Sequence, residues 1–595
     1  MGLLQSFSRE YTTINTFRGL QKWTKALGPD RVETVADDLE QAVDAHARRI
    51  AVRFEGQVAT YAELDARANS IAHWALSQGI RAGDTIALFM ENRPDYIAIW
   101  YGLAKVGVIT SLINTNLTGE GLKHCIDTCG ASHVITGAEQ DAAMHTVLGS
   151  LQDEPTLWTL GGTAGLDLEA MLRRLPVDRP NRAYRARLRG KDTCLYVYTS
   201  GTTGLPKAAK LSQLRLATMM RSFIAPCNVT EKDRVYVPLP LYHATGGVCA
   251  IGIALLTGAT VVLRRKFSAS AFWDDCADND VTVFVYIGEL CRYLVNQPEH
   301  RKERAHSVRA AFGNGLSGDI WQTFSDRFGI SKLIEFYAST EGNVRYMNVD
   351  GKVGAVGRVP PYLKFAFDHI AIVKYDPATE QPVRDAEGRC MLAAHDEPGE
   401  AIGRVGQDGR SSFDGYKDPD ATERKVLNSV FEDGDTWFRT GDLLKQDAEG
   451  YVYFVDRIGD TFRWKGENVS TQDVSAALCK QSGIATANVY GVKVPRTDGR
   501  AGMAAVTLTG PVDFHNLYGC LRARLPAYAM PAFLRVQREA ATTGTFKFRK
   551  TDLVEQGFDP SKTTDALWYL DAATGVYQPL DKDAFTQIET GAIQF

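Results

Sequence analysis

Segments typical of strands alternate with segments typical of helices in the first third of the chain, and this alternation restricts the fold most strongly. A strand is predicted at Thr85–Phe89, a helix at Asp95–Lys105, and further strands at Val108–Thr110 and His133–Thr136. Strands that alternate with helices form mostly parallel sheets with helices on both faces. Ligands of such sheets bind at the carboxyl ends of the strands. We therefore expect an α/β fold with a ligand site at one sheet edge.

A loop rich in glycine and hydroxyl groups follows another predicted strand, Leu195–Val197. Its glycines let the backbone approach a ligand, its hydroxyl groups can donate hydrogen bonds, and Lys207 adds a positive charge. In a Walker-type loop a helix begins at the lysine, whereas Pro206 disfavours a helix here. A surface turn without a ligand is the alternative. The pattern favours phosphate binding by Tyr198, Thr199, Ser200, Gly201, Thr202, Thr203, Gly204 and Lys207.

Composition excludes several other classes of protein. The 595 residues, 44% of them hydrophobic, can bury a large core in several domains. A net charge of -4 gives no basic surface for nucleic acid. The ten cysteines form no CxxC pair, so a reduced cytoplasmic setting is expected. Cys125 and Cys129 beside His124 could hold a metal, but buried thiols on one helix face are the favoured interpretation.

The N-terminus lacks the features of a secretory signal. Two other segments are relevant to membrane contact. The uncharged run Ala244–Leu263 has roughly the length of a membrane span, about 20 residues. Its glycines and strand-like end favour a buried helix, a turn at Gly258 and a buried strand instead. Apolar residues recur at helical spacing from Tyr11 to Leu27, and Gly28–Pro29 ends that helix. This helix either packs on its own domain or makes a peripheral contact with the inner face of the membrane.

The stretch Tyr198–Lys207 also resembles the phosphate-binding signature of adenylate-forming enzymes, the acyl-CoA synthetase and luciferase superfamily. The segments Gly83–Leu117, Tyr286–Leu294 and Trp568–Asp571 are similar to the fatty acid transport protein branch, also called very-long-chain acyl-CoA synthetases. The resemblance covers nearly the whole chain and is weakest before Thr34. It implies a large domain over 1–457 that includes a β subdomain, and a small mobile α+β domain over 458–595.

The resemblance also implies a nucleotide site. Glu341 would bind Mg²⁺, and a carboxylate beside hydroxyl groups at the end of a predicted strand, Leu333–Phe336, suits a hard cation. A solvated loop carboxylate is the alternative for Glu341. The remaining implied ATP or AMP contacts are Gly313, Asn314 and Gly315 against adenine, Tyr337 stacked on adenine, Ala338 and Ser339, Thr340 on the α-phosphate, Asp442 on the ribose hydroxyls, and Arg457 on ribose or phosphate.

The resemblance also implies which residues contact the fatty acid and CoA and which form the hinge between the domains. His243 would lie beside the reacting carboxylate, and Lys547 would bridge the carboxylate and the α-phosphate. The small residues Ala244–Gly247 after His243 would leave room for a chain and supply no tryptophan gate. The hinge would be Gly459 or Asp460, where the family usually has Asp or Lys two residues after the arginine. The acyl-pocket candidates are Tyr242, Tyr286, Gly288 and Leu290, and the CoA-facing candidates are Trp464, Lys465, Gly466 and Glu467.

The implied reaction is ATP-dependent activation of a long- or very-long-chain fatty acid to an acyl-adenylate, followed by transfer to CoA, with Mg²⁺ as cofactor. An enzyme nucleophile is not required, because the substrate carboxylate and the CoA thiol supply both nucleophiles. Delivery to a carrier-protein thiol is the nearest alternative. A peripheral protein for fatty acid uptake or binding is the alternative of a different class, and a homodimer is compatible with the sequence.

Overall fold

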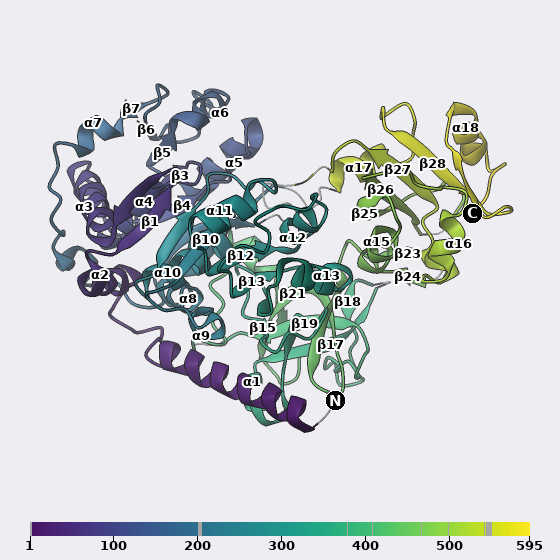
Figure 1. Ribbon diagram of the computed structural model, residues 1–595, viewed down its shortest axis with the longest axis horizontal. Helices are drawn as coiled ribbons and strands as arrows, with labels where there is room; N and C mark the ends of the chain where they lie inside the picture. The colour runs from purple at the N-terminus through teal and green to yellow at the C-terminus, as the bar shows by residue number, and fades with distance from the viewer. Residues whose placement is uncertain are drawn as a thin grey trace.

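The computed structural model describes residues 3–199, 205–377, 379–406, 408–465, 467–497, 499–540, 542 and 550–595. Figure 1 shows a large body of helices and sheets and a smaller C-terminal unit at its right-hand side. The predicted Ser200–Gly204 segment of the loop, Gly466 and Lys547 lie outside the described residues.

The first sheet confirms the alternation of strands and helices. Its strand order is β7-β6-β5-β3-β4-β8-β9, and its pairs are parallel except for the hairpin β8–β9. The helices α4 (Pro94–Lys105) and α5 (Gly119–Cys129) follow the first two strands, as predicted. Cys125 and Cys129 are buried on α5 among apolar side chains. The strands are β3 (Thr85–Phe89), β4 (Ile109–Leu112), β5 (His133–Gly137), β6 (Thr156–Leu160), β7 (Leu166–Asp167), β8 (Thr193–Thr199) and β9 (Lys207–Ser212).

The second sheet has the order β15-β14-β13-β12-β10-β11-β1-β2 and is parallel except at its two edges. The uncharged run forms a π-helical turn η3 (Thr245–Ala250), α10 (Ile251–Leu255), a turn at Gly258 and the buried strand β11, as predicted. The strands are β1 (Ile50–Phe54), β2 (Gln57–Thr60), β10 (Arg234–Val237), β11 (Thr260–Leu263), β12 (Val283–Ile287), β13 (Ala310–Asn314), β14 (Leu333–Ala338) and β15 (Arg345–Asn348).

The third sheet is antiparallel and forms the expected β subdomain, with the order β16-β22-β21-β19-β17-β18 and β20 paired to β21. Pro361 starts a 3₁₀ turn, η4 (Pro361–Ala366), ahead of the strand that begins at Ile370. The strands are β16 (Gly357–Arg358), β17 (Ile370–Asp376), β18 (Gln381–Pro382), β19 (Gly399–Arg404), β20 (Val426–Asn428), β21 (Thr436–Gln446) and β22 (Tyr451–Arg457).

The C-terminal unit is α+β and has its own apolar core. A short hairpin, β23–β24, precedes a sheet of order β25-β26-β27-β28-β29. Its strands are β23 (Phe462–Trp464), β24 (Glu467–Val469), β25 (Ile484–Val492), β26 (Ala501–Leu508), β27 (Phe533–Gln537), β28 (Ala566–Asp571) and β29 (Val576–Pro579). Its helices are α15 (Thr471–Cys479), α16 (Leu517–Arg522), α17 (Thr551–Gln556) and α18 (Lys582–Thr590).

The first helix, α1 (Leu3–Thr24), lies along the lower edge of the molecule in Figure 1. It packs on α9 (Ile224–Cys227), where a Cβ at Gly19 would lie 2.6 Å from the Cβ of Ala225. Trp23 and Leu27 pack against the main core. The C-terminal end of this segment therefore packs on the protein, whereas Tyr11, the first residue of the predicted apolar series, is 62% exposed. Within the described chain, no helix has both the length and the apolar character needed to cross a membrane.

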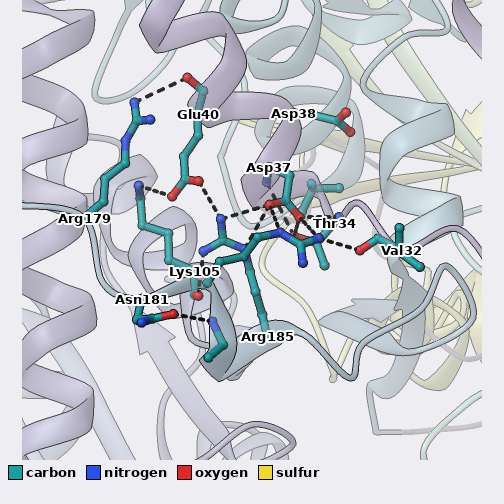
Figure 2. Close-up of polar contacts among 12 residues, drawn as sticks. Val32, Thr34, Asp37, Asp38, Glu40, Lys105, Arg179, Asn181 and Arg185 are labelled. Carbon is teal, nitrogen blue, oxygen red and sulfur yellow. Dashed lines mark hydrogen bonds and ion pairs between the residues drawn. The ribbon is translucent and has the colours of Figure 1, made fainter.

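A network of buried charges ties α2 (Val35–His46) to the large body (Figure 2). The nitrogen Nζ of Lys105, which is 0% exposed, lies 2.8 Å from a carboxylate oxygen of Glu40 and 2.8 Å from one of Asp65 in α3 (Tyr61–Ser77). Arg185 in η2 (Arg182–Arg185) donates to Asp37 at 3.0 Å. The helix ends at His46, and β1 begins at Ile50. Buried charges require such partners, so this network fixes the segment.

Candidate active site

A buried carboxylate holds the loop expected to face adenine. Glu335 in β14 is 1% exposed, and one of its oxygens accepts the backbone N–H groups of Gly315 and Leu316. Its other oxygen accepts the hydroxyl of Tyr286 at 2.8 Å. Burial raises the pKa of the Glu335 carboxyl to about 8. Gly313 lies between Tyr286 and Glu335 in the parallel register, so three neighbouring strands meet at this loop.

The helix α12 (Gly288–Val295) approaches the same loop very closely. A Cβ at Gly288 would lie 1.6 Å from the carbonyl oxygen of Gly315, so only glycine fits there. Leu290 is fully buried in the main core. Two of the acyl-pocket candidates, Tyr286 and Gly288, thus support the backbone of the 313–316 loop, Tyr286 through Glu335 and Gly288 by direct contact.

The second and third sheets meet at Tyr337 and Asp442. The Tyr337 hydroxyl donates to a carboxylate oxygen of Asp442 at 2.6 Å, and the Tyr337 ring lies between those of Tyr346 and Phe454. Asp442 in β21 is directly opposite Arg457 in β22, and the two side chains approach to 3.6 Å. The structure therefore brings together the expected adenine, ribose and phosphate residues.

Beside this junction, the segment from Ser339 to Gly342 is held from two sides. Glu341 is buried, and its Oε1 accepts the hydroxyl of Tyr416 at 2.7 Å. Burial, together with the charge of Glu341, raises the pKa of Tyr416 well above its ordinary value. Arg215 is also buried, and its Nη1 donates to the carbonyls of Thr340 at 3.2 Å and Gly342 at 2.6 Å. The Gly342 N–H donates to the Ser339 hydroxyl at 3.0 Å.

The hairpin β8–β9 brings Lys207 to the same place. Lys207 pairs with Thr199 in the hairpin, and its Nζ lies 5.9 Å from the centre of the Tyr416 ring. Burial lowers the pKa of Lys207, and the positive charges of Arg424 and Lys425 add to this shift. The described ends of the phosphate loop therefore reach the Glu341 carboxylate. Arg215, Tyr416 and Glu335 were not among the residues that the sequence indicated.

Tyr198 differs from its neighbours in the predicted loop. Its side chain is buried under the hairpin, where its hydroxyl contacts the Ser111 hydroxyl at 3.1 Å and donates to the carbonyl of Cys125. Burial raises the pKa of Tyr198 well above its ordinary value. The side chain belongs to the core of the first sheet, so its position is structural.

The residues expected at the reacting carboxylate lie at the end of β10. The rings of Tyr242 and His243 are 4.5 Å apart, and the Tyr242 hydroxyl accepts from the amide of Asn116 at 3.2 Å. Burial raises the pKa of Tyr242 to about 12. A Cβ at Gly247 would lie 1.8 Å from the carbonyl oxygen of Leu241, so close backbone packing requires glycine there.

The CoA-facing candidates lie in the hairpin β23–β24. Trp464 is buried and pairs with Glu467, whereas Lys465, with φ +51°, is exposed at the turn with its Nζ 5.9 Å from the Trp464 ring. In the hinge, Gly459 has φ +94° with open space around it. Asp460 forms an ion pair of 3.0 Å with Lys550. Of these two residues, Gly459 has the left-handed backbone conformation, which glycine adopts without steric strain.

The donor set around Glu341 fits Mg²⁺. In the part of the chain that the structure describes, no three His, Cys, Asp or Glu side chains are grouped to bind a metal. Mg²⁺ typically binds proteins through one or two carboxylates together with substrate phosphates. Glu341 has one oxygen engaged by Tyr416, which leaves Oε2 for a cation beside the described ends of the loop.

Comparisons with known proteins identify the family. Residues 39–400 match the model of the AMP-binding enzyme family. The chain is 43% identical over 562 residues to long-chain fatty acid transport protein 6 of Mus musculus, covering 93% of this chain and 90% of the relative. It is 43% identical over 544 residues to long-chain fatty acid transport protein 1 of Homo sapiens, covering 90% and 84%.

Solved structures share the fold. A crystal structure of an anthranilate CoA ligase in complex with anthranoyl-AMP superposes with a TM-score of 0.74 at 19% identity, covering 87% of this chain and 96% of that one. A Mycobacterium tuberculosis fatty acyl CoA synthetase superposes with a TM-score of 0.63 at 23% identity, covering 88% and 98%. Together with the family match, these findings show that the chain belongs to the AMP-binding enzyme family of AMP-forming ligases, in its fatty acid transport protein branch.

Proposed function

We propose that this protein converts a long- or very-long-chain fatty acid, ATP and CoA into acyl-CoA, AMP and pyrophosphate. The observation that carries this proposal is the convergence of Tyr337, Asp442 and Arg457 beside Glu341 and Lys207 at one junction of sheets. The names of the curated relatives, long-chain fatty acid transport proteins, support the class of acid. Aromatic, acidic and basic groups in this arrangement suit adenine, ribose and phosphates respectively.

In the first step, a carboxylate oxygen of the fatty acid attacks the α-phosphorus and pyrophosphate leaves. The 313–315 loop and Tyr337 would hold adenine, Asp442 would accept from the ribose hydroxyls, and Thr340 would donate to the α-phosphate. Lys547 would bridge the carboxylate and the α-phosphate. Mg²⁺ on Glu341, when bound, would offset the phosphate charge. Catalysis would then rest on positioning and on charge.

In the second step, the CoA thiol attacks the acyl carbonyl carbon, AMP leaves, and the thiol proton passes to solvent. We propose that residues 458–595 rotate relative to 1–457 about Gly459 or Asp460 between the steps. The left-handed backbone and open surroundings of Gly459 favour it as the pivot. The rotation would withdraw Lys547 and bring the hairpin from Trp464 to Glu467 toward the thioester.

The reacting carboxylate would lie beside Tyr242 and His243. Each buried methylene of the fatty acid would add roughly 0.8 kcal/mol of binding, so an apolar tunnel favours long chains. Chain-length preference is therefore a property to be measured with a ladder of acids.

The alternative in which the acyl group passes to a carrier-protein thiol shares the first step. Peripheral binding or uptake of fatty acid without turnover requires no adenylate at all. The contacts around Glu341 favour the ligase over simple binding, because a buried carboxylate with one free oxygen has no use in holding an apolar chain. A homodimer is compatible with each of these functions.

The test measures pyrophosphate, AMP and thioester with MgATP and a ladder of fatty acids, with and without CoA. Wild type and Lys547→Ala are compared, with Lys562→Ala, an exposed lysine of the same unit, as the matched control. We expect thioester formation that depends on CoA, peaks at long chains, is lost in Lys547→Ala and is kept in the control. Pyrophosphate without thioester would identify the carrier-protein reaction, and fatty acid binding without turnover would refute the ligase.

A further inference from the structure

The outer face of α1 is aromatic at one end and basic at the other. Its apolar side packs on α9 and the main core through Gly19, Trp23 and Leu27, so the exposed side chains are those of the opposite face. These exposed positions follow helical spacing on a helix that lies along the edge of the molecule (Figure 1). They include Phe7, Tyr11, Asn15, Arg18, Gln21, Lys22 and, in the turn after the helix, Lys25.

A second aromatic pair lies next to the N-terminal half of α1. The Tyr362 hydroxyl of η4 donates to the carboxylate of Glu10, and Arg358 binds the same carboxylate at 2.8 Å. Phe365 follows one turn later. Phe7 and Tyr11 are 73% and 62% exposed, and Tyr362 and Phe365 are 44% and 64% exposed. Of the five exposed Phe and Tyr side chains in the described residues, all except Tyr184 therefore lie on α1 or η4.

The charge of this face is positive. Glu10 is the only acidic residue of α1, and it is paired with Arg9 at 2.9 Å and with Arg358. Arg18, Lys22 and Lys25 are exposed, and within the described part of the chain no acidic side chain pairs with them. Lys364, between the two aromatic residues of η4, is exposed as well. Exposed aromatic rings next to uncompensated cations are the combination that binds the headgroup region of an anionic bilayer.

We propose that the outer face of α1 together with η4, the α1–η4 face, docks on an anionic lipid surface. Phe7, Tyr11, Tyr362 and Phe365 would enter the headgroup region, and Arg18, Lys22, Lys25 and Lys364 would bind lipid phosphates. A second copy of this chain docked through the same face would place its own cations opposite these, which is why an anionic surface is favoured over a second copy. The inference goes beyond the ligase reaction, because none of these side chains belongs to the site described above.

Co-sedimentation with lipid vesicles tests this surface with the full-length protein. Vesicles of phosphatidylcholine alone are compared with vesicles that also contain phosphatidylglycerol. The variants are Phe7→Ser with Phe365→Ser, and Arg18→Gln with Lys22→Gln and Lys25→Gln; Tyr184→Ser, which removes the exposed aromatic side chain outside the face, is the control. We expect wild type and control to bind the anionic vesicles and both variant sets to bind more weakly, the triple variant about a hundredfold, since each cation near the surface adds about 1 kcal/mol.

The remaining outcomes overturn the proposal. These are no binding by wild type, equal binding to both kinds of vesicle, or loss of binding in only one of the two variant sets. Sedimentation velocity without lipid tests whether a second copy of this chain occupies the face instead. A wild-type dimer that dissociates in the Phe7→Ser, Phe365→Ser variant, together with no vesicle binding, would assign the face to a second copy. Ligase assays with detergent-solubilised fatty acid separate this result from the reaction, because all variants should keep wild-type activity there.

Discussion

The hydroxyl of Tyr416 donates a hydrogen bond of 2.7 Å to Oε1 of Glu341, across 75 positions of the sequence. This contact joins the loop after β14 to the loop that precedes β20. It holds one oxygen of the carboxylate proposed to bind Mg²⁺ and leaves the other free. The aromatic ring of the same tyrosine lies under Lys207.

Tyr416→Phe should therefore weaken the response to Mg²⁺. A hydrogen bond to a charged group contributes about 1.5 to 3 kcal/mol, so we expect the Mg²⁺ concentration for half-maximal AMP formation to rise about ten- to hundredfold. Tyr453→Phe, which removes a hydroxyl bonded to Asp447 at 3.1 Å, is the matched control. Equal Mg²⁺ curves for both variants would show that Tyr416 does not position Glu341.

Glu335→Gln should affect the nucleotide and the pH dependence of stability. The glutamine carbonyl oxygen can still accept an N–H group of the 313–316 loop, but its NH₂ group cannot accept the Tyr286 hydroxyl. At a pH above about 8, where Glu335 is ionised and accepts this hydroxyl, we expect the KM for ATP to rise several-fold while the KM for fatty acid stays unchanged. A similar change in both constants would indicate general distortion of the site.

The pH effect of Glu335 follows from its raised pKa of about 8. The folded protein binds this proton more tightly than the unfolded chain, whose Glu has a pKa near 4.3. The wild type should therefore lose unfolding free energy, relative to Glu335→Gln, as the pH rises from about 4.3 to 8, with no further loss above that range. Urea denaturation of both proteins across this range measures the difference. A flat difference would show that Glu335 titrates normally.

The sheets could be predicted because their signals are local. Thr85–Phe89 is a run of apolar and β-branched residues, and the structure forms β3 over these same residues. The family motifs were also local, and they led to Tyr337, Asp442 and Arg457, which the structure brings together. Boundaries were less accurate, since the strand predicted at Val108–Thr110 lies at Ile109–Leu112.

The supporting residues of the site could not be predicted, because their partners are distant in sequence. Arg215 binds a carbonyl 125 positions away, and nothing around Arg215 indicates that contact. Glu335 was included in a predicted strand, but only the neighbouring strands show that it holds the 313–316 loop. The sequence likewise does not show that Gly246 and Gly247 pack against backbone atoms of Leu239 to Leu241.

Lys105→Met should destabilise the large body strongly. The substitution leaves Glu40 and Asp65 without their shared buried cation, and breaking a buried pair on one side costs about 3 to 5 kcal/mol. Arg173→Gln, which removes an exposed partner of Glu169, should cost at most about 0.5 kcal/mol. Urea denaturation compares the two variants, and equal midpoints would contradict the structural role of the network.

Gly459→Ala should separate the two steps of the reaction. A Cβ at this position meets no atom within 4 Å, so the folded structure should tolerate it, but φ +94° is strained for alanine by about 1 kcal/mol. Rotation about the hinge requires new backbone angles at this residue, and alanine restricts them. We expect thioester formation to slow several-fold while the first burst of pyrophosphate keeps its rate. Gly510→Ala is the control, because its Cβ is also unobstructed and its φ is not positive. If Gly459→Ala and Gly510→Ala give the same ratio of thioester to pyrophosphate, the pivot is not Gly459, and Asp460→Asn, which releases Lys550, becomes the variant to measure.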